Sequence, residues 1–170
     1  CPLTPQTKHL VSAAALAALL LRVLAGQDPA DATKTINVAA GGAEYLATAV
    51  AELRRKNANH VFVGAGDLVG ASPLLSALFR DEPTIESLSA MGLEVSAVGN
   101  HEFDRGSDEL LRLQRGGCKE TNGVREPNSC QGAVVGTPVP FEGARFKWLS
   151  ANVVATASGN SADKRRIALA

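Results

Sequence analysis

Two short apolar runs decide the fold: His60-Val61-Phe62-Val63-Gly64-Ala65-Gly66-Asp67 and Val95-Ser96-Ala97-Val98-Gly99-Asn100-His101-Glu102-Phe103-Asp104. Each run is rich in β-branched and small residues and is bounded by glycine, which predicts a buried strand. The chain between them has helical spacing, so the two strands are expected to be parallel neighbours whose carboxyl ends share one edge. Open α/β sheets bind ligands at that edge. We therefore expect four side chains to meet there: Asp67, Asn100, His101 and Asp104.

The composition is that of a packed domain. The chain has 170 residues, and 45% of them are apolar, which is enough for a core and argues against disorder. The 17 basic and 17 acidic residues balance to zero net charge, and aromatic residues are sparse. A nucleic-acid polymer or an acidic lipid surface is therefore not an expected partner.

The N-terminal region has the pattern of an export signal. A short basic region precedes an apolar run over 10–21, which is shorter than the ~20 residues of a membrane span. Val23-Leu24-Ala25 offers the small residues of a signal-peptidase site. Residues 1–25 are interpreted as a signal peptide region, with an ordinary Ala/Leu-rich helix as the alternative, and 26–34 as a flexible linker. The expected location is periplasmic or secreted, without a stable membrane anchor.

The chain from residue 35 onward alternates strand and helix patterns, which predicts an α/β domain of mainly parallel strands with flanking helices. Further strands are expected at 35–38 and 146–154, with Trp148 at the rim of the latter. Helices are expected at 43–56, from Ser72, from Thr84 to Met91, and from Ser107; the buried face of the second is expected to be formed by Leu74, Leu75, Leu78 and Phe79.

Residues 116–140 show no periodicity, which predicts a long surface loop. Cys118 and Cys130 flank much of this segment. The pattern leaves two alternatives open: a local disulfide, if the protein is exported, or two free loop thiols.

The ends of the two central strands carry groups suited to a divalent cation. A carboxylate after a buried strand, as at Asp67, is costly unless it is paired or bound to a cation. The alternative is an Asp that caps the following turn. Asn100 supplies an amide oxygen from the neighbouring strand end, and such oxygens are donors for a divalent cation. Asp67 and Asn100 are therefore the candidate metal ligands.

His101 and Asp104 are candidate catalytic residues. Their three-residue spacing suits a pair across one turn, in which the carboxylate orients the imidazole and supports its protonated form. A protonated His101 could stabilise charge on a phosphoryl group or protonate a leaving oxygen. The alternative is a pair that only caps the loop. Glu102 is interpreted as a solvated loop charge without a role, and Phe103 as packing under the loop.

Gly66-Asp67 followed by Gly99-Asn100-His101-Glu102-Phe103-Asp104 resembles the signature of calcineurin-like metallophosphoesterases. The longer sequence from Gly64 through Ser72-Pro73-Leu74-Leu75 is similar to that of the exported bacterial branch, which contains 5'-nucleotidases, UDP-sugar hydrolases and 2',3'-cyclic phosphodiesterases. The resemblance implies an α/β sandwich and two divalent metals of the manganese, zinc, iron or magnesium class. It makes Asp67 the bridging ligand, Asn100 a ligand of the second metal, and His101 with Asp104 the catalytic pair.

The chain also departs from the family pattern. The family has Asp-x-His at the end of its first strand and a later lone His followed by Gly-His-x-His, and this sequence contains neither. Its histidines are His9, His60 and His101. We therefore expect residues 35–170 to be a partial N-terminal metallophosphoesterase domain with roughly half of a two-metal site.

The expected function is hydrolysis of a nucleotide or related phosphate ester, in a protein whose nucleotide-binding C-terminal domain lies outside this chain. The residues that bind the substrate are unknown. Two alternatives stay open: a non-catalytic scaffold or binding module derived from the same fold, and an enzyme completed by a separate chain that carries the missing histidines.

Overall fold

A four-stranded parallel sheet forms the centre of the molecule. The computed structural model describes residues 10–11, 23–39, 42–132, 134, 136–151 and 153. The strand order is β1-β4-β5-β8, and every neighbouring pair is parallel. The four strands are Leu10–Val11, Val63–Gly64, Val95–Ala97 and Lys147–Leu149. The predicted fold class, mainly parallel strands with flanking helices, is confirmed.

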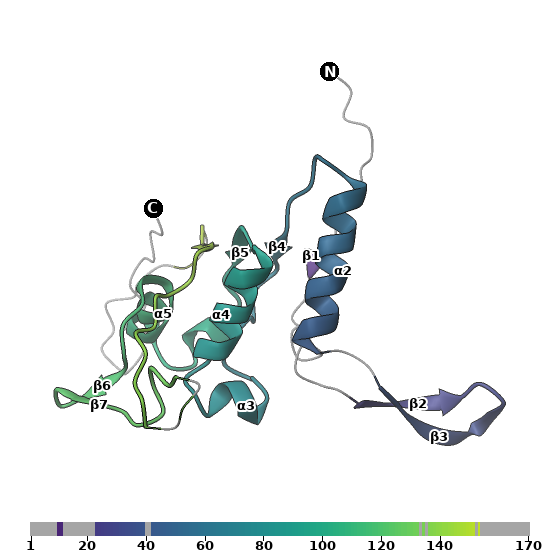
Figure 1. The fold of residues 1–170 in the computed structure, drawn as a ribbon, viewed down its shortest axis with the longest axis horizontal. Coiled ribbons are helices and arrows are strands. Elements are labelled where there is room, and N and C mark those ends of the chain that lie inside the picture. The colour runs from purple at the N-terminus through teal and green to yellow at the C-terminus, as the bar shows by residue number, and fades with distance from the viewer. Residues whose placement is uncertain are drawn as a thin grey trace.

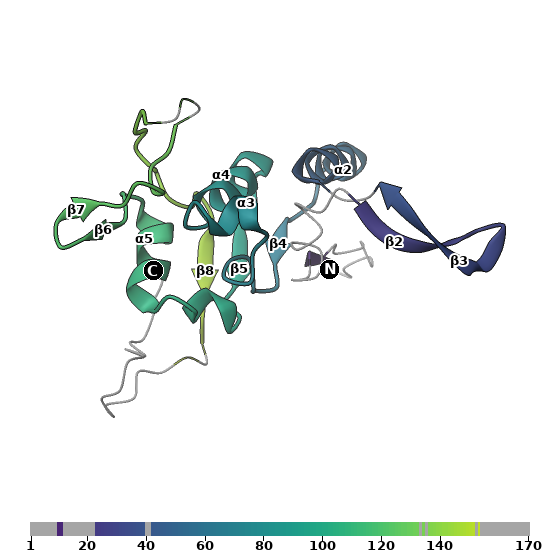
Figure 2. The same cartoon turned by 90° about the horizontal axis from the view of Figure 1, so that it is seen from below.

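Helices flank this sheet along its length (Figures 1 and 2). They are α2 (Ala43–Lys56), α3 (Leu74–Ala77), α4 (Glu82–Met91), the short 3-10 helix η1 (His101–Phe103) and α5 (Ser107–Arg115). In Figure 2, α2 and α4 lie on the same side of the row of strands. The Gln114 side chain of α5 donates to the carbonyl oxygen of Phe146 and accepts from the backbone N–H of Trp148, which fastens α5 to β8.

The core lies between α4, α5 and β8. Ile85, Leu88, Leu110, Phe146 and Trp148 are fully buried. The rings of Phe146 and Trp148 pack edge to face with centroids 4.9 Å apart, a favoured aromatic geometry. The prediction that Trp148 lies at the rim of its strand is wrong, because its ring faces into the core that α5 closes.

Helix α4 follows the sequence pattern closely. Its buried apolar residues include Ile85, Leu88 and Met91, and it ends at Gly92, whose φ of 76° is the left-handed conformation that terminates helices. It begins at Glu82 rather than Thr84, because a proline is tolerated in the first turn, where its missing N–H is not needed.

The apolar face predicted for the helix after Ser72 is not buried. Leu74, Leu75 and Leu78 are 77%, 64% and 51% exposed. Helix α3 is only four residues long, and left-handed residues at Arg80 and Asp81 turn the chain away from it. One turn cannot present a continuous stripe to a core, so the leucines remain on the surface.

The N-terminal segment differs from its prediction as well. Strands β2 (Val23–Asp28) and β3 (Asp31–Ala39) form an antiparallel hairpin that extends away from the sheet (Figure 1). The predicted linker 26–34 therefore lies within this hairpin, and the predicted strand 35–38 lies within β3 rather than in the parallel sheet. The turn is stabilised by Asp28, whose carboxylate accepts from the N–H of Ala30.

Leu10–Val11, within the predicted signal peptide region, pairs with Val63–Gly64 in the parallel sheet. Most of 1–25 and all of 154–170 lie outside the described residues. No helix in the described part of the chain is long and apolar enough to cross a membrane.

The segment 116–140 contains a disulfide and a small hairpin. Cys118 and Cys130 are bonded, with Cα atoms 5.3 Å apart, so the disulfide alternative is confirmed. Strands β6 (Glu120–Thr121) and β7 (Val124–Arg125) pair within the loop.

Buried charges hold this disulfide loop against the core. Glu82 of α4 accepts from the backbone N–H of Cys130 at 2.7 Å and pairs with Arg112 of α5 at 2.8 Å. Arg112 also pairs with Glu109, which in turn pairs with Lys119. Both glutamates are at least 95% buried, so these partners offset the cost of removing the carboxylates from water.

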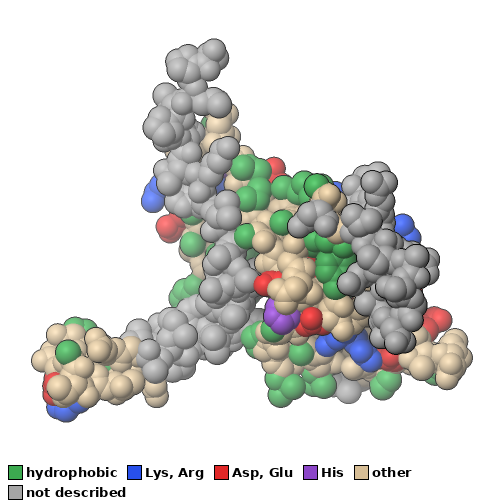
Figure 3. Space-filling model, turned by 180° about the vertical axis from the view of Figure 1, so that it is seen from behind, with side chains coloured by type: hydrophobic (Ala, Val, Ile, Leu, Met, Phe, Trp, Pro, Cys, Tyr) green, Lys and Arg blue, Asp and Glu red, His purple; other side chains and the backbone are tan. Residues whose placement is uncertain are grey.

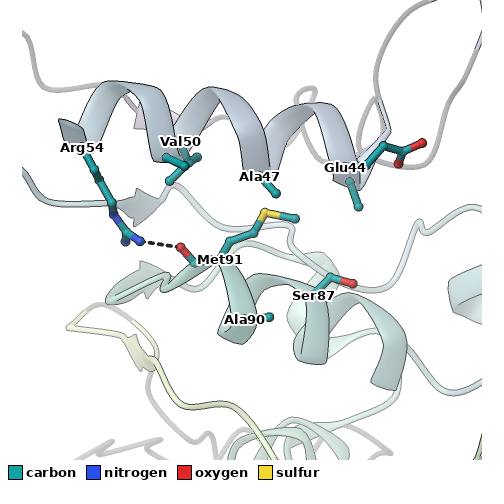
Figure 4. Close-up of a pocket in the computed structure, with 9 residues that line it drawn as sticks. Glu44, Ala47, Val50, Arg54, Ser87, Ala90 and Met91 are labelled. Carbon is teal, nitrogen blue, oxygen red and sulfur yellow. Dashed lines mark hydrogen bonds between the residues drawn. The ribbon is translucent and has the colours of Figure 1, made fainter. Parts of the chain in front are cut away.

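Helix α2 meets the rest of the domain mainly through α4. The guanidinium of Arg54 donates to the carbonyl oxygens of Met91 and Gly92 at 2.7 and 2.6 Å, and so caps the end of α4 (Figure 4). A groove of about 580 Å³ runs between the two helices, lined mostly by small side chains such as Ala47 and Ala90. None of the predicted site residues lines it.

Candidate active site

The loops after β4 and β5 converge at one edge of the sheet. The carboxylate Oδ1 of Asp67 accepts a hydrogen bond from the backbone N–H of His101 at 3.1 Å. This contact joins residues 34 positions apart, as parallel neighbouring strands require. The predicted meeting of Asp67 with the His101 loop is therefore observed.

His101 and Asp104 form the predicted pair. The imidazole Nδ1 lies 2.8 Å from Oδ2 of Asp104, and the two side chains are 35% and 43% exposed. The hydrogen bond to Asp104 raises the pKa of His101, desolvation opposes the shift, and the charges of Asp104, Asp67 and Glu102 add to it. The imidazolium form is therefore favoured at this edge. A histidine beside acidic side chains is visible on the face shown in Figure 3.

Asn100 lies at the start of η1 and is exposed. It follows Gly99 directly, and Gly99 packs against the Asp67 carboxylate. Asn100 therefore lies at the same edge of the sheet as Asp67.

Glycines permit this convergence. A Cβ on Gly99 would collide with the Asp67 carboxylate, and a Cβ on Gly70 would lie 2.7 Å from Oδ2 of Asp104. The group that Gly99 accommodates is the Asp67 side chain. Both positions must lack a side chain for the loops to pack as they do.

Glu102 is the residue that the sequence interpretation missed. It is 3% exposed, not solvated, and its carboxylate accepts hydrogen bonds from three backbone N–H groups, those of Asp67, Leu68 and Gly99. The neighbouring Phe103 packs against the core, as expected. The sequence held no signal for this role, because only the folded loops bring the three amides to the Glu102 carboxylate.

The donors present do not complete a two-metal centre. Asp67 and Asn100 offer a carboxylate and an amide oxygen, which suit one side of a divalent-cation site. Among the described residues, however, no group of three or more His, Cys, Asp or Glu side chains could hold a metal ion. His60 bonds to the carbonyl oxygen of Asn57 at the start of the β4 segment, and His9 lies outside the described residues.

Comparison with known proteins identifies relatives of this chain. The chain is 44% identical over 132 residues to an uncharacterized protein in the pqq-V 5' region of Acinetobacter calcoaceticus, which covers 78% of this chain and 61% of that protein. It is 30% identical over 87 residues to the 5'-nucleotidase of Bos taurus, covering 50% of this chain and 15% of that enzyme. No family model matches the chain.

The structure of NAD nucleotidase (NadN) from Haemophilus influenzae shares the fold. It superposes with a TM-score of 0.59 and 22% sequence identity over 92% of this chain and 22% of that one. The fold is thus that of a metallophosphoesterase domain. The named 5'-nucleotidase relative and this shared fold support the calcineurin-like metallophosphoesterase / 5'-nucleotidase family, with the chain matching part of an N-terminal domain. It spans 61% or less of the length of each of these relatives.

Proposed function

We propose that this chain belongs to a longer protein that hydrolyses nucleotide phosphate esters. The observation that supports the proposal is that Asp67 meets the His101–Asp104 pair at the carboxyl edge of a parallel sheet. Oδ1 of Asp67 lies 3.1 Å from the backbone N of His101, and Nδ1 of His101 lies 2.8 Å from Oδ2 of Asp104. A charged imidazole suits the stabilisation of an anionic phosphoryl group, and a carboxylate beside it suits the binding of a metal cation. Because the chain covers only part of its relatives, nucleotide recognition is assigned to a C-terminal domain outside it.

In this proposal His101 acts as the acid. Its hydrogen bond to Asp104 favours the protonated imidazole, and its remaining ring nitrogen, Nε2, is the group that donates to a phosphoryl or leaving oxygen. Asp104 orients the ring through Nδ1 and stabilises its positive charge.

Asp67 and Asn100 are proposed to contribute ligands to the divalent metals on which this family of hydrolases depends. Such metals activate water and polarise phosphoryl oxygens. The missing Asp-x-His and Gly-His-x-His ligands must come from sequence outside this chain. We therefore expect the 170-residue chain alone to bind metal weakly and to turn over little or no substrate.

Two assays test this proposal. The 170-residue chain is incubated with Mn²⁺ or Zn²⁺ and either p-nitrophenyl phosphate or AMP, with His101→Ala as the control. Robust hydrolysis that His101→Ala abolishes would refute the incomplete site. The coding DNA on both sides of the segment is then read, and the longer protein is assayed on AMP. An inactive longer protein with all the ligands present would refute the nucleotidase function itself.

The incomplete donor set favours a second candidate, a non-catalytic module that retained the scaffold. Thermal melting with and without Mn²⁺ separates the two candidates. A metal-binding fragment gains stability with increasing Mn²⁺ because the metal binds only the folded form, whereas a module shows the same Tm throughout.

We also propose that the protein is exported. The apolar N-terminal run and the Cys118–Cys130 bond support this location, since disulfides persist in oxidising compartments. Intact mass of protein recovered from the periplasm tests it. Cleavage after Ala25 gives a mature chain that begins at Gly26, and retention of Leu10–Val11 in that chain would contradict the signal peptide.

A further inference from the structure

The Glu102 carboxylate lies where the two site loops meet. Its Oε2 accepts from the N–H of Asp67 at 2.8 Å and from the N–H of Gly99 at 2.6 Å. Its Oε1 accepts from the N–H of Leu68 at 2.7 Å. Two of these donors belong to the loop after β4, and the third belongs to the loop after β5, which carries Glu102 itself.

The two loops exchange bonds in both directions. Glu102, from the second loop, binds amides of the first, while Asp67, from the first loop, accepts the His101 N–H of the second. Each loop therefore supplies a carboxylate for the backbone of the other. Without Glu102, the amides of the first loop would have no bond to the second loop. Without Asp67, the amide of His101 in the second loop would have no bond to the first.

Burial makes the Glu102 bonds strong and costly to remove. The residue is 3% exposed, and hydrogen bonds to an ionised carboxylate are stronger than those between neutral groups. Without Glu102, the N–H groups of Leu68 and its neighbours would lose their acceptor at a mostly buried position.

The backbone of Asp67 needs this support. Its φ is 54°, in the left-handed region that residues with a side chain rarely occupy. The bonds from the N–H groups of Asp67 and Leu68 to Glu102 fix this conformation, and the conformation directs the Asp67 carboxylate against Gly99 and the His101 amide.

We propose that Glu102 is a positioning residue, which acts on the candidate site by holding the Asp67 carboxylate in place. This inference rests on the proposed function, because that function assigns the roles of Asp67 and His101. Glu102 is not a metal ligand in this arrangement, since both of its oxygens face backbone amides. It acts before any substrate or metal is present, by fixing the distance between the two loops.

Amide hydrogen exchange of the full 170-residue chain, measured by NMR, tests the proposal without a metal. Glu102→Gln keeps the size of the side chain but replaces one acceptor oxygen with an NH₂ group. It should speed exchange at Asp67, Leu68 and Gly99 at least about tenfold, because each bond lost opens the loop locally. The amide of Leu88 in α4 serves as the reference for global unfolding.

The decisive readout is the amide of His101, whose N–H donates to Asp67 and not to the Glu102 carboxylate. If Glu102 positions Asp67, Glu102→Gln also speeds exchange at His101, because the acceptor on Asp67 moves away. Unchanged exchange at His101 would reduce Glu102 to a local structural residue and overturn the proposal.

Glu82→Gln is the matched control. Glu82 is also buried and accepts from a backbone amide, that of Cys130, but its hydrogen-bond partners Cys130, Ser129 and Arg112 are not residues of the two loops. It should speed exchange at Cys130 and leave Asp67, Gly99 and His101 unchanged relative to Leu88. Equal acceleration of the site amides in both variants would also overturn the proposal.

Two further outcomes are separable. If Glu102→Gln does not fold, hydrogen exchange of the wild-type chain still tests the proposal. Unprotected amides at Asp67 and Gly99 would show that their hydrogen bonds to Glu102 do not hold the loops together. A Mn²⁺ titration of the wild-type chain then tests the proposed function separately. Absence of paramagnetic broadening near Asp67 would count against metal binding. Slow exchange at the amides of Asp67, Leu68 and Gly99 would still support the role of Glu102.

Discussion

The Asp67 carboxylate accepts the His101 amide at 3.1 Å, across 34 residues of chain, and the glycine at position 99 lies directly against that carboxylate. The contact depends on the absence of a side chain at Gly99. Any Cβ there would force the Asp67 carboxylate to move, and the nearest atoms include the backbone of Asp67, which cannot yield cheaply.

Gly99→Ala is therefore expected to destabilise the domain by about 1–3 kcal/mol, the usual cost of overpacking. Urea denaturation measures the loss, and the amide shift of His101 reports the displaced carboxylate. Gly123→Ala is the comparison, because a Cβ at Gly123 meets nothing within 4 Å, although its φ of 76° carries strain of its own. Unchanged His101 shifts in Gly99→Ala would contradict the packing described.

Asp104→Asn should lower the pKa of His101 toward its ordinary value. The hydrogen bond to Asp104 is the main cause of the raised pKa, and an amide supplies no charge. Because the pKa of His101 is raised in the folded state, the His101–Asp104 pair contributes to folding stability below pH ~6.5. This contribution is lost as the pH rises through the folded-state pKa. An NMR titration of the His101 ring in both proteins measures the shift. Identical titration curves would show that the pair does not form in solution.

Glu109→Gln should cost about 1–3 kcal/mol at neutral pH, as for a buried hydrogen bond to a charged group. Burial acts to raise the pKa of Glu109, but its hydrogen bond with Arg112 and the charges of Arg112 and Lys119 outweigh burial and lower it. The folded-state pKa is depressed, so the contribution is present above the unfolded value and is lost as the pH falls through the folded-state pKa.

Denaturation of wild-type and Glu109→Gln chains at pH 7 and pH 3 tests this sign. The difference in unfolding free energy between the wild-type and Glu109→Gln chains should be smaller at pH 3 than at pH 7. A gap that widened on acidification would mean that Glu109 is not stabilised as a carboxylate.

Reduction of the Cys118–Cys130 bond should lower the free energy of unfolding by about 2–3 kcal/mol, given its sequence separation of 12. Urea denaturation with and without reductant measures the change. Thiol counting in urea is the control: the three cysteines of the sequence give one reactive thiol before reduction and three after it. Three reactive thiols in the unreduced protein would contradict the bond.

Leu75→Ser should change stability by less than about 0.5 kcal/mol, because the side chain is already 64% exposed. Ile85→Ala, at a fully buried position, should cost about 2–5 kcal/mol. Thermal melting compares the two variants. A comparable loss in both would show that α3 packs against the core, as its leucine spacing suggested.

The sequence pattern was sufficient to place the loops of the candidate site. Strands that end in Gly-Asp and Gly-Asn-His, with a helical stretch between them, can bring their ends together only in a parallel pair, and Asp67 does meet His101. The buried residues of α4 were equally predictable, because Ile85, Leu88 and Met91 repeat over more than one turn.

The errors arose where tertiary contacts decide the outcome. A glutamate in a polar loop is expected to be solvated, and only the folded backbone supplies the three amides that bury Glu102. The leucines of α3 have helical spacing, but the helix ends after four residues. The pairing of Cys118 with Cys130 could not be decided from spacing. A disulfide requires the two Cα atoms to lie close enough for the sulfur atoms to bond, and only the folded loop sets that distance.

The parallel pairing of β5 with β8 has a consequence for synthesis of the chain. Ser96 pairs with Trp148, so the core that surrounds Ile85 and Leu110 cannot close until the ribosome has released the segment around residue 148. Until then the nascent chain presents an open strand edge and an unfilled apolar interior, which is the state that chaperones bind. A translational pause upstream of Phe146 would therefore prolong the interval in which this domain is most prone to aggregate.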